Sequence, residues 1–190
     1  FKGNVIVTNP DYVLTAEDLV YDITTKIATI NSPNTITRSD GTVLNAEIGS
    51  EFNTIRNTSL FIVSEIESDS YILEADSIFF DEALKFYRAL RNVKMIGKEN
   101  DVVITGNEAR YWKPLGITVV YGNPVMKKND KGDTLYLTAD TLTSLDHPEP
   151  ERRRVLAHKN VKLFKTGLRG KSDSLAYFMA DSVLHFYQDP

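Results

Sequence analysis

The sequence "EADSIFFDEALKFYRALRNVKM", residues 74–95, is compatible with two different folds. Its second half is rich in residues that favour helices, and apolar residues recur there at helical spacing, at Ala83, Phe86, Leu90 and Val93. Its first half is aromatic and contains a β-branched residue, which is typical of a strand. The rest of the chain has to decide whether this stretch is a helix or a pair of strands.

A short motif recurs along the whole chain and points to strands. It consists of a small residue, an acid or amide, any residue, an aliphatic residue, any residue and an aromatic residue. Its copies begin at Ala16, Ala46, Ala75, Gly106, Ala139 and Ser172, and a further copy begins at Ala180. The first six starts lie 29 to 33 residues apart, and such a period predicts a stack of similar units.

A second motif, Asn followed by Val or another β-forming residue, lies between the copies of the first, as in "GNVIV", "RNVKM" and "KNVKL". The Asn precedes the next small-acid motif by 12 to 16 residues, at Asn4, Asn34, Asn92, Asn123 and Asn160. Turn-forming residues separate the motifs, and the segments between the turns are rich in Val, Ile, Thr and Tyr. Each period therefore predicts two antiparallel strands.

The alignment of neighbouring repeats resolves the ambiguous stretch. The segment that aligns with its second half, "KPLGITVVYGN", contains Pro, Gly and a β-branched run that would not form a helix. We therefore predict a strand at Phe86–Leu90 after a turn at Asp81–Lys85. The alternative is a short helix within Asp81–Arg91 that replaces one unit of the stack.

Composition limits the other possibilities. The chain of 190 residues has no cysteine and a net charge of −4, which gives no support for nucleic acid binding. It contains no transmembrane segment, because no run of 18 apolar residues exists. We expect one repetitive domain over residues 1–190, cut from a longer chain, with two fused units and a soft boundary near 58–70 as the variant.

The sequence offers little for an enzyme, a metal or another cofactor, and we expect none of the three. The histidines lack metal-ligand spacing, at His147, His158 and His185. Acids recur with the repeat, at Glu17, Asp76, Asp140, Asp173 and Asp181. A catalytic pair needs two unlike environments, so these repeated acids are better read as solvent-facing or turn residues.

Strand alternation predicts an apolar lining along the stack. Residues of one parity in the two motifs are mostly aliphatic or aromatic. The candidate groove residues are Val5, Val7, Leu19, Tyr21, Ile78, Phe80, Val93, Met95, Tyr111, Met126, Leu142, Val161, Leu163, Leu175 and Tyr177. The lining is either the packed core of a closed solenoid or a groove for an apolar ligand.

The most basic stretch is "ERRRV", with Arg152–Arg154, followed by Lys159, Lys162 and Lys165. It is either a solvated turn and strand face or a patch for phosphate-bearing ligands. The solvated turn and strand face is the favoured reading, and the sequence assigns no further role to Arg152–Arg154.

The alternating motifs, in "GNVIV…YVLTAEDLVYD", "ADSIFFD…RNVKM" and "KNVKL…SDSLAYF", resemble the OstA/LptA family of periplasmic lipopolysaccharide-transport proteins. The resemblance covers nearly the full chain. It implies a β-jellyroll, two stacked antiparallel sheets in a V, with about 12–14 strands from repeats of about 30 residues. The second repeat departs from the pattern, with Gly49 and Glu51 where aliphatic and aromatic residues are expected.

The resemblance also implies a function. Such a module is not an enzyme; it shields the acyl chains of lipopolysaccharide in its apolar groove during transport across the periplasm to the outer membrane. Its partners would be lipopolysaccharide and other jellyroll components, joined end to end by strand pairing, with self-association as a further outcome. The competing hypothesis is a structural β-solenoid scaffold with a closed core, and a polysaccharide-active enzyme ranks third.

Overall fold

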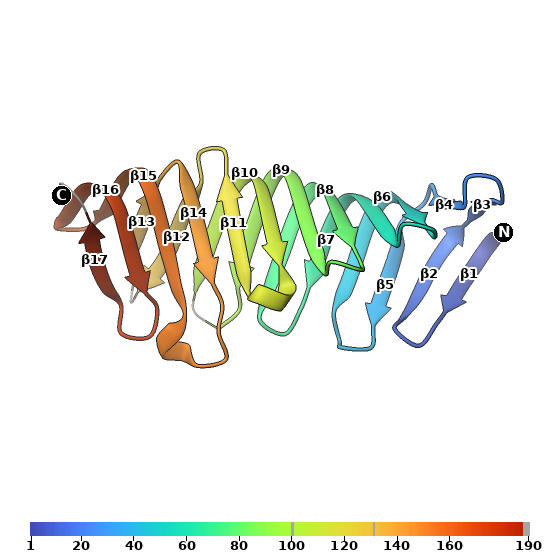
Figure 1. Ribbon diagram of the computed structural model, residues 1–190, viewed down its shortest axis with the longest axis horizontal. Coiled ribbons are helices and arrows are strands. Elements are labelled where there is room, and N and C mark those ends of the chain that lie inside the picture. Colours follow the sequence, from blue (N-terminus) through green and yellow to red (C-terminus); the bar gives the residue numbers. More distant parts are fainter. Residues whose placement is uncertain (100, 131, 188–190) are drawn as a thin grey trace.

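The protein is an elongated stack of antiparallel strands (Figure 1) in a computed structural model that describes residues 1–99, 101–130 and 132–187. The strands are β1 (Lys2–Thr8), β2 (Tyr12–Asp18), β3 (Val20–Asp22), β4 (Ile27–Ile30), β5 (Asn34–Arg38), β6 (Val43–Asn53), β7 (Thr58–Glu67), β8 (Tyr71–Asp81), β9 (Phe86–Gly97), β10 (Val102–Trp112), β11 (Ile117–Tyr121), β12 (Val125–Asp130), β13 (Asp133–Thr138), β14 (Thr141–Leu145), β15 (Arg154–Lys165), β16 (Leu168–Phe178) and β17 (Val183–Tyr187). Two single-turn 3₁₀ helices, η1 (Lys113–Leu115) and η2 (Pro150–Arg152), lie in turns. The all-β prediction is confirmed.

The chain crosses the stack repeatedly and reverses direction at a turn after each crossing. We call each crossing, from one turn to the next, a pass. Four pairs of strands are the two halves of one pass: β2 with β3, β4 with β5, β11 with β12, and β13 with β14. The described residues form seventeen strands, more than the 12–14 expected, because four passes are each divided into two strands; the number of passes is thirteen. The ladder is continuous through residues 58–67, because β7 pairs with both β6 and β8.

The ambiguous stretch is strand, turn and strand. β8 ends at Asp81, residues 82–85 form the turn, and β9 begins at Phe86. The predicted strand at Phe86–Leu90 is confirmed and the helix alternative is wrong. Tertiary pairing has overridden helix propensity here, because β9 bonds to strands on both sides.

The Asn-Val motif forms the corner at which a pass bends. Two consecutive residues adopt left-handed backbone conformations at four corners: Gly3 and Asn4, Arg91 and Asn92, Gly122 and Asn123, and Lys159 and Asn160. The pairing register shifts beside Asn4, Asn92 and Asn160, so the corner is a β-bulge that folds one half of the pass toward the other. Asn suits this position because it tolerates positive φ better than other residues with a side chain, which explains why it recurs with the repeat.

The small-acid motif lies on the neighbouring pass at the same corner. Its small residue fills the inside of the bend, where Ala46 and Ala75 are buried. Its acid lies outside and bonds to the corner amide: Asn92 Nδ2 donates to Asp76 Oδ1 at 2.9 Å, and Asn160 Nδ2 donates to Asp140 at 3.0 Å. The two sequence motifs therefore form one structural device, and these acids have a structural partner.

The last copy of the small-acid motif and the irregular second repeat both differ from the other repeats for local reasons. The motif copy that begins at Ala180 starts in a turn, residues 179–182, and its second half is β17. In the second repeat, a Cβ added at Gly49 would lie 2.4 Å from the carbonyl oxygen of Ile30. The departure of this repeat from the pattern therefore lets two passes approach closely.

Hairpin turns of equal length follow β3, β6, β8, β10 and β16, and we call them the first turn row. Each has four residues and ends on a left-handed residue: Lys26, Asn57, Lys85, Gly116 and Ser182. The side chain before the turn often caps it, as Asp22 Oδ1 accepts from the backbone N–H of Thr24 at 2.7 Å. The turns after β1, β5, β7, β9 and β15 form the second turn row at the other ends of the bent passes.

The corner at Val63 provides a test of this account. Val63 adopts a φ of 46° at the corner of β7, although a β-branched residue is strained there, and it is 36% exposed. We expect Val63→Asn to raise the free energy of unfolding by about 1 kcal/mol, because Asn relieves the left-handed strain. The converse change, Asn92→Val, should lower it by at least as much. Urea denaturation measures both, and equal stability of all three proteins would contradict the role of Asn.

Candidate functional site: the interior and its mouth

The interior between the two halves of the bent passes is apolar along the stack. The described residues form one hydrophobic cluster that extends from Leu14 near the N-terminal end to Tyr177 near the C-terminal end. Ten of the candidate groove residues are buried in it: Leu19, Ile78, Phe80, Val93, Met126, Leu142, Val161, Leu163, Leu175 and Tyr177. The structure thus brings most of the candidates together on one inward face.

The remaining five candidates are more accessible. Val5, Met95 and Tyr111 are partly buried against the same cluster. Val7 pairs with Leu14 and shares its inward face, but it is 36% exposed because β1 pairs with β2 alone among the described residues. Tyr21 is 42% exposed, and its hydroxyl lies 3.4 Å from Thr54 Oγ1 in the first turn row. The continuous lining expected from alternation is therefore incomplete at the N-terminal end.

The two turn rows face each other across an opening that we call the mouth. Because each pass bends at its corner, its two ends return toward the same side of the molecule. Strand residues next to opposite rows then make contact, as when the rings of Tyr71 at the start of β8 and Tyr111 near the end of β10 meet edge to face with centroids 5.9 Å apart. The mouth is the side of the interior across which no backbone ladder runs between the described residues.

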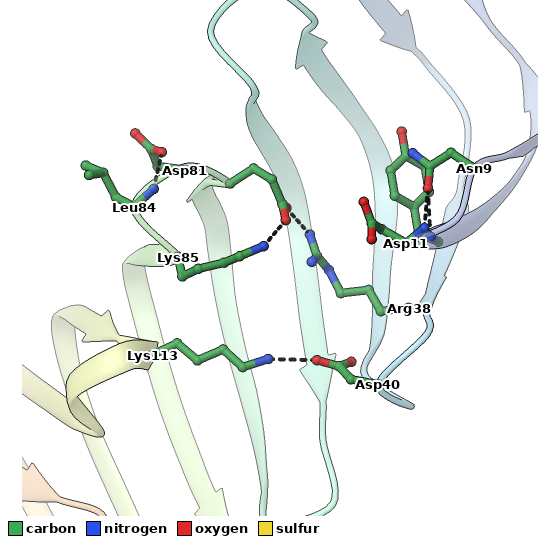
Figure 2. Close-up of polar contacts among 10 residues, drawn as sticks. Asn9, Asp11, Arg38, Asp40, Asp81, Leu84, Lys85 and Lys113 are labelled. Atoms are coloured by element: carbon green, nitrogen blue, oxygen red, sulfur yellow. Dashed lines mark hydrogen bonds and ion pairs between the residues drawn. The ribbon is translucent and has the colours of Figure 1, made fainter.

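Two ion pairs cross the middle of the mouth (Figure 2), and we call them the latches. Arg38 at the end of β5 donates to Glu82 in the first turn row, at 2.6 Å between Nη2 and Oε2. Lys113 in η1 donates to Asp40 in the second turn row, at 2.7 Å between Nζ and Oδ2. Lys85 also contacts Glu82. These pairs join segments 44 and 73 residues apart in sequence.

The environment of the latches shifts the pKa values of both carboxyls. The Lys113 ammonium holds the pKa of Asp40 far below its ordinary value. Burial alone would raise the pKa of Glu82, but hydrogen bonds from Arg38 and Lys85 lower it. The guanidinium of Arg38 lies 4.5 Å above the ring of Phe80, and its Nε is buried without a hydrogen-bond partner. The latch therefore holds a cation directly over the apolar interior.

Cavities lie under the mouth on both sides of the latches. One of about 290 Å³ is open near the N-terminal end, and its walls include Tyr12, Ile36, Phe52, Phe61 and Arg38. Another, of about 90 Å³, has walls that include Tyr71, Met95, Tyr111, Leu145 and Met179. Side chains near the corners, such as Val93 and Val161, are buried, whereas cavities remain toward the mouth.

The second cavity has its own polar rim. Arg153 joins Glu99 across the mouth, at 2.9 Å between Nη1 and Oε2, and its Nε donates to the carbonyl of His147 at 2.7 Å. Burial strongly raises the pKa of Tyr71 in the wall and raises that of nearby Tyr87 to about 12, so both phenols stay neutral at ordinary pH. Arg153 belongs to the basic cluster at Arg152–Arg154, for which the sequence assigned no role.

Sequence reasoning missed several residues of the mouth. Tyr12, Ile36, Phe52, Phe61 and Tyr71 share the inward face, and the alternation of their strands was the available signal. The latches carried no such signal, because their partners lie on turns far apart in the chain.

Within the described ranges, no group of three His, Asp or Glu side chains is arranged to hold a metal ion. Within the same ranges, no helix is long and apolar enough to cross a membrane.

The latches predict a specific pH dependence. Because both carboxyls have folded-state pKa values below their ordinary ones, their stabilisation is complete above the pKa of an unfolded carboxyl, about 4. It is lost as the pH falls through the folded values. We expect the free energy of unfolding to fall below pH of about 4 and to fall less steeply in the Asp40→Asn/Glu82→Gln variant. Urea denaturation across pH measures both slopes, and identical slopes would contradict the assignment.

The fold has a counterpart among solved structures. The chain matches the crystal structure of LptH from Pseudomonas aeruginosa, described as the LptA-homologous periplasmic component of the lipopolysaccharide transport device. The match has a TM-score of 0.54 at 15% identity and covers 63% of this chain and 82% of LptH. It confirms the expected OstA/LptA-type β-jellyroll. No family model and no curated protein matches the sequence.

Proposed function

We propose that this chain is a non-enzymatic carrier module of the cell envelope that shields lipopolysaccharide acyl chains during transport across the periplasm. The observation that carries the proposal is the apolar interior, which is packed at its corners and open in cavities along the mouth. The shared fold with LptH, which is named as a transport component, supports the same reading. Burial of acyl chains would contribute roughly 0.8 kcal/mol per CH₂ group.

In this proposal, acyl chains enter sideways through the mouth and lie against Tyr71, Met95 and Tyr111. The latches must then separate or widen, because they cross the entry path. Among the described residues, β1 pairs with β2 alone and β17 with β16 alone. Their outer edges fit the proposed end-to-end pairing with other jellyroll components or with a second copy, since an unpaired strand edge is a template for another strand. We treat residues 1–190 as one carrier unit rather than two fused ones.

Photo-crosslinking in cells tests the proposal. A photoreactive amino acid at Met95 or Tyr111 should crosslink to lipopolysaccharide, because these side chains are partly buried beside the cavity. Their sequence neighbours Lys94 and Arg110 point to the outer face and serve as matched controls. Crosslinks confined to Lys94 and Arg110 would contradict the groove.

The closed scaffold is the alternative that the same experiment addresses. Full burial of Met126, Leu142 and Val155 in the C-terminal half supports it, because no ligand reaches those side chains without rearrangement. Under this alternative none of the four probes captures lipopolysaccharide. Crosslinks at both inward positions would exclude it.

A further inference from the structure

A row of cations and aromatic rings crosses the outer face of the stack near its C-terminal end, where β12, β13, β15 and β16 lie side by side (Figure 1). Cross-strand pairing places Lys127 opposite Tyr136, Tyr136 opposite Phe164, and Phe164 opposite Arg169. Directly opposite residues share one face of a sheet, and this face is the outer one because Leu137 and Leu163 point inward. We call these four residues the outer ladder.

The outer ladder presents two aromatic rings to solvent. Tyr136 is 37% exposed and Phe164 is 47% exposed, and their centroids lie 6.4 Å apart. A cation lies beside each ring, Lys127 at 5.8 Å from the Tyr136 centroid and Arg169 at 5.4 Å from the Phe164 centroid. Two adjacent exposed rings, each flanked by a cation, offer a surface on which a ligand ring can stack.

A second row runs beside the outer ladder and carries an unfavourable pair. Thr138 lies opposite Lys162, and Lys162 lies opposite Lys171. Like charges placed directly opposite each other destabilise a sheet. Neither row contains a carboxylate, and among the described residues Lys127, Lys162, Arg169 and Lys171 form no ion pair. The face therefore places four cations without ion pairs close together in a chain whose net charge is −4.

We propose that this face binds a phosphorylated saccharide, with the apolar face of a sugar ring on Tyr136 and Phe164 and its phosphates on the surrounding cations. Arg169 suits a phosphate because its guanidinium offers paired donors, and Lys162 and Lys171 together form a site at which an anion relieves their repulsion. The saccharide region of a lipopolysaccharide is the phosphorylated saccharide that fits the proposed function. Only this choice of saccharide rests on the proposed function. The site lies on the outer face, so it is distinct from the acyl-chain groove.

Other anionic partners fit this face less well. A single-stranded nucleic acid would call for a longer cationic track with more stacking platforms than two rings. A bilayer surface would favour a broader set of exposed aliphatic groups beside the cations. Both partners become outcomes of the test.

Calorimetric titration of the purified chain tests the inference. The probe is the soluble phosphorylated oligosaccharide released from lipopolysaccharide by mild acid, which has no acyl chains and therefore cannot report on the groove. We expect it to bind, to bind more weakly as salt rises, and to lose most of its affinity after chemical dephosphorylation. If the oligosaccharide binds but Met95 and Tyr111 give no crosslinks, the carrier function is contradicted and the outer site is supported. If Met95 and Tyr111 give crosslinks but the oligosaccharide does not bind, only the outer site is contradicted.

Matched variants assign the binding to the outer face. Lys162→Gln/Lys171→Gln should weaken the oligosaccharide roughly tenfold through loss of two cations, and Tyr136→Ala/Phe164→Ala should weaken it roughly tenfold through loss of the rings. Lys26→Gln/Arg56→Gln removes two exposed cations at the other end of the stack and should change nothing. The inference is overturned if the control weakens binding as much, if dephosphorylation has no effect, or if the oligosaccharide does not bind. It is also overturned if oligothymidylate or phosphatidylglycerol vesicles bind more tightly than the oligosaccharide.

Discussion

Replacing Phe80 with Ala should lower the free energy of unfolding by about 3–5 kcal/mol. Phe80 is 1% exposed, its ring stacks on Tyr87 with centroids 4.2 Å apart, and the Arg38 guanidinium lies on it. Its removal leaves a cavity beneath the latches and takes away the surface that supports the buried cation. Urea denaturation monitored by circular dichroism measures the loss.

Leu84 is the matched control for Phe80, because it lies in the same stretch and is 66% exposed in the turn. Leu84→Ala should change the free energy of unfolding by no more than about 0.5 kcal/mol. If Leu84→Ala were as costly as Phe80→Ala, the turn would be packed against something, and the assignment of its face to solvent would fail.

Replacing Gly49 with Ala should cost about 3 kcal/mol, near the upper end for overpacking. The added Cβ would lie 2.4 Å from the Ile30 carbonyl oxygen and 3.4 Å from the Asn31 Cα. Both are backbone atoms, which cannot rotate away as a side chain can. The two passes must separate, which also disturbs the buried hydrogen bond of 2.9 Å from Ser50 Oγ to Asn34 Oδ1.

Ile48→Ala provides the comparison at the same corner, since Ile48 is 57% exposed. Its truncation should be nearly neutral. A Gly49→Ala variant as stable as Ile48→Ala would show that β4 and β6 can move apart freely, and would remove the steric reason for the irregular second repeat.

The fold could be predicted from the sequence because its repeat is regular. Period, turn residues and strand alternation are local properties, and they identified the strand at Phe86 against a helical pattern. The Asn-Val motif was recognised, but its role was not: Asn92 and Asn160 mark bends within passes, and only the backbone conformation reveals this. The exposure of Val7 was missed for a related reason, because alternation assigns a face and not the presence of a neighbouring strand.

The polar features of the surface could not be predicted because they depend on pairing between distant segments. Arg38 meets Glu82 only when the bend brings the two turn rows together. The outer ladder depends on the pairing of β13 with β15, although β14 lies between them in sequence. This pairing occurs because β13 and β14 are two halves of one pass, and each half pairs with a different part of β15. Lys162 was noted in the sequence as part of a basic stretch, whereas its opposition to Lys171 became visible only in the register.

The stack of passes also sets a distance. Each pass advances the structure by roughly 4.8 Å, so the thirteen passes extend over roughly 60 Å. Each pass pairs mainly with its two neighbours, so removing or duplicating one repeat would change the length by about 10 Å and leave the cross-section as it is. The number of repeats in the stack therefore sets its length, whereas the corner and the mouth of each pass determine what it can hold along that length.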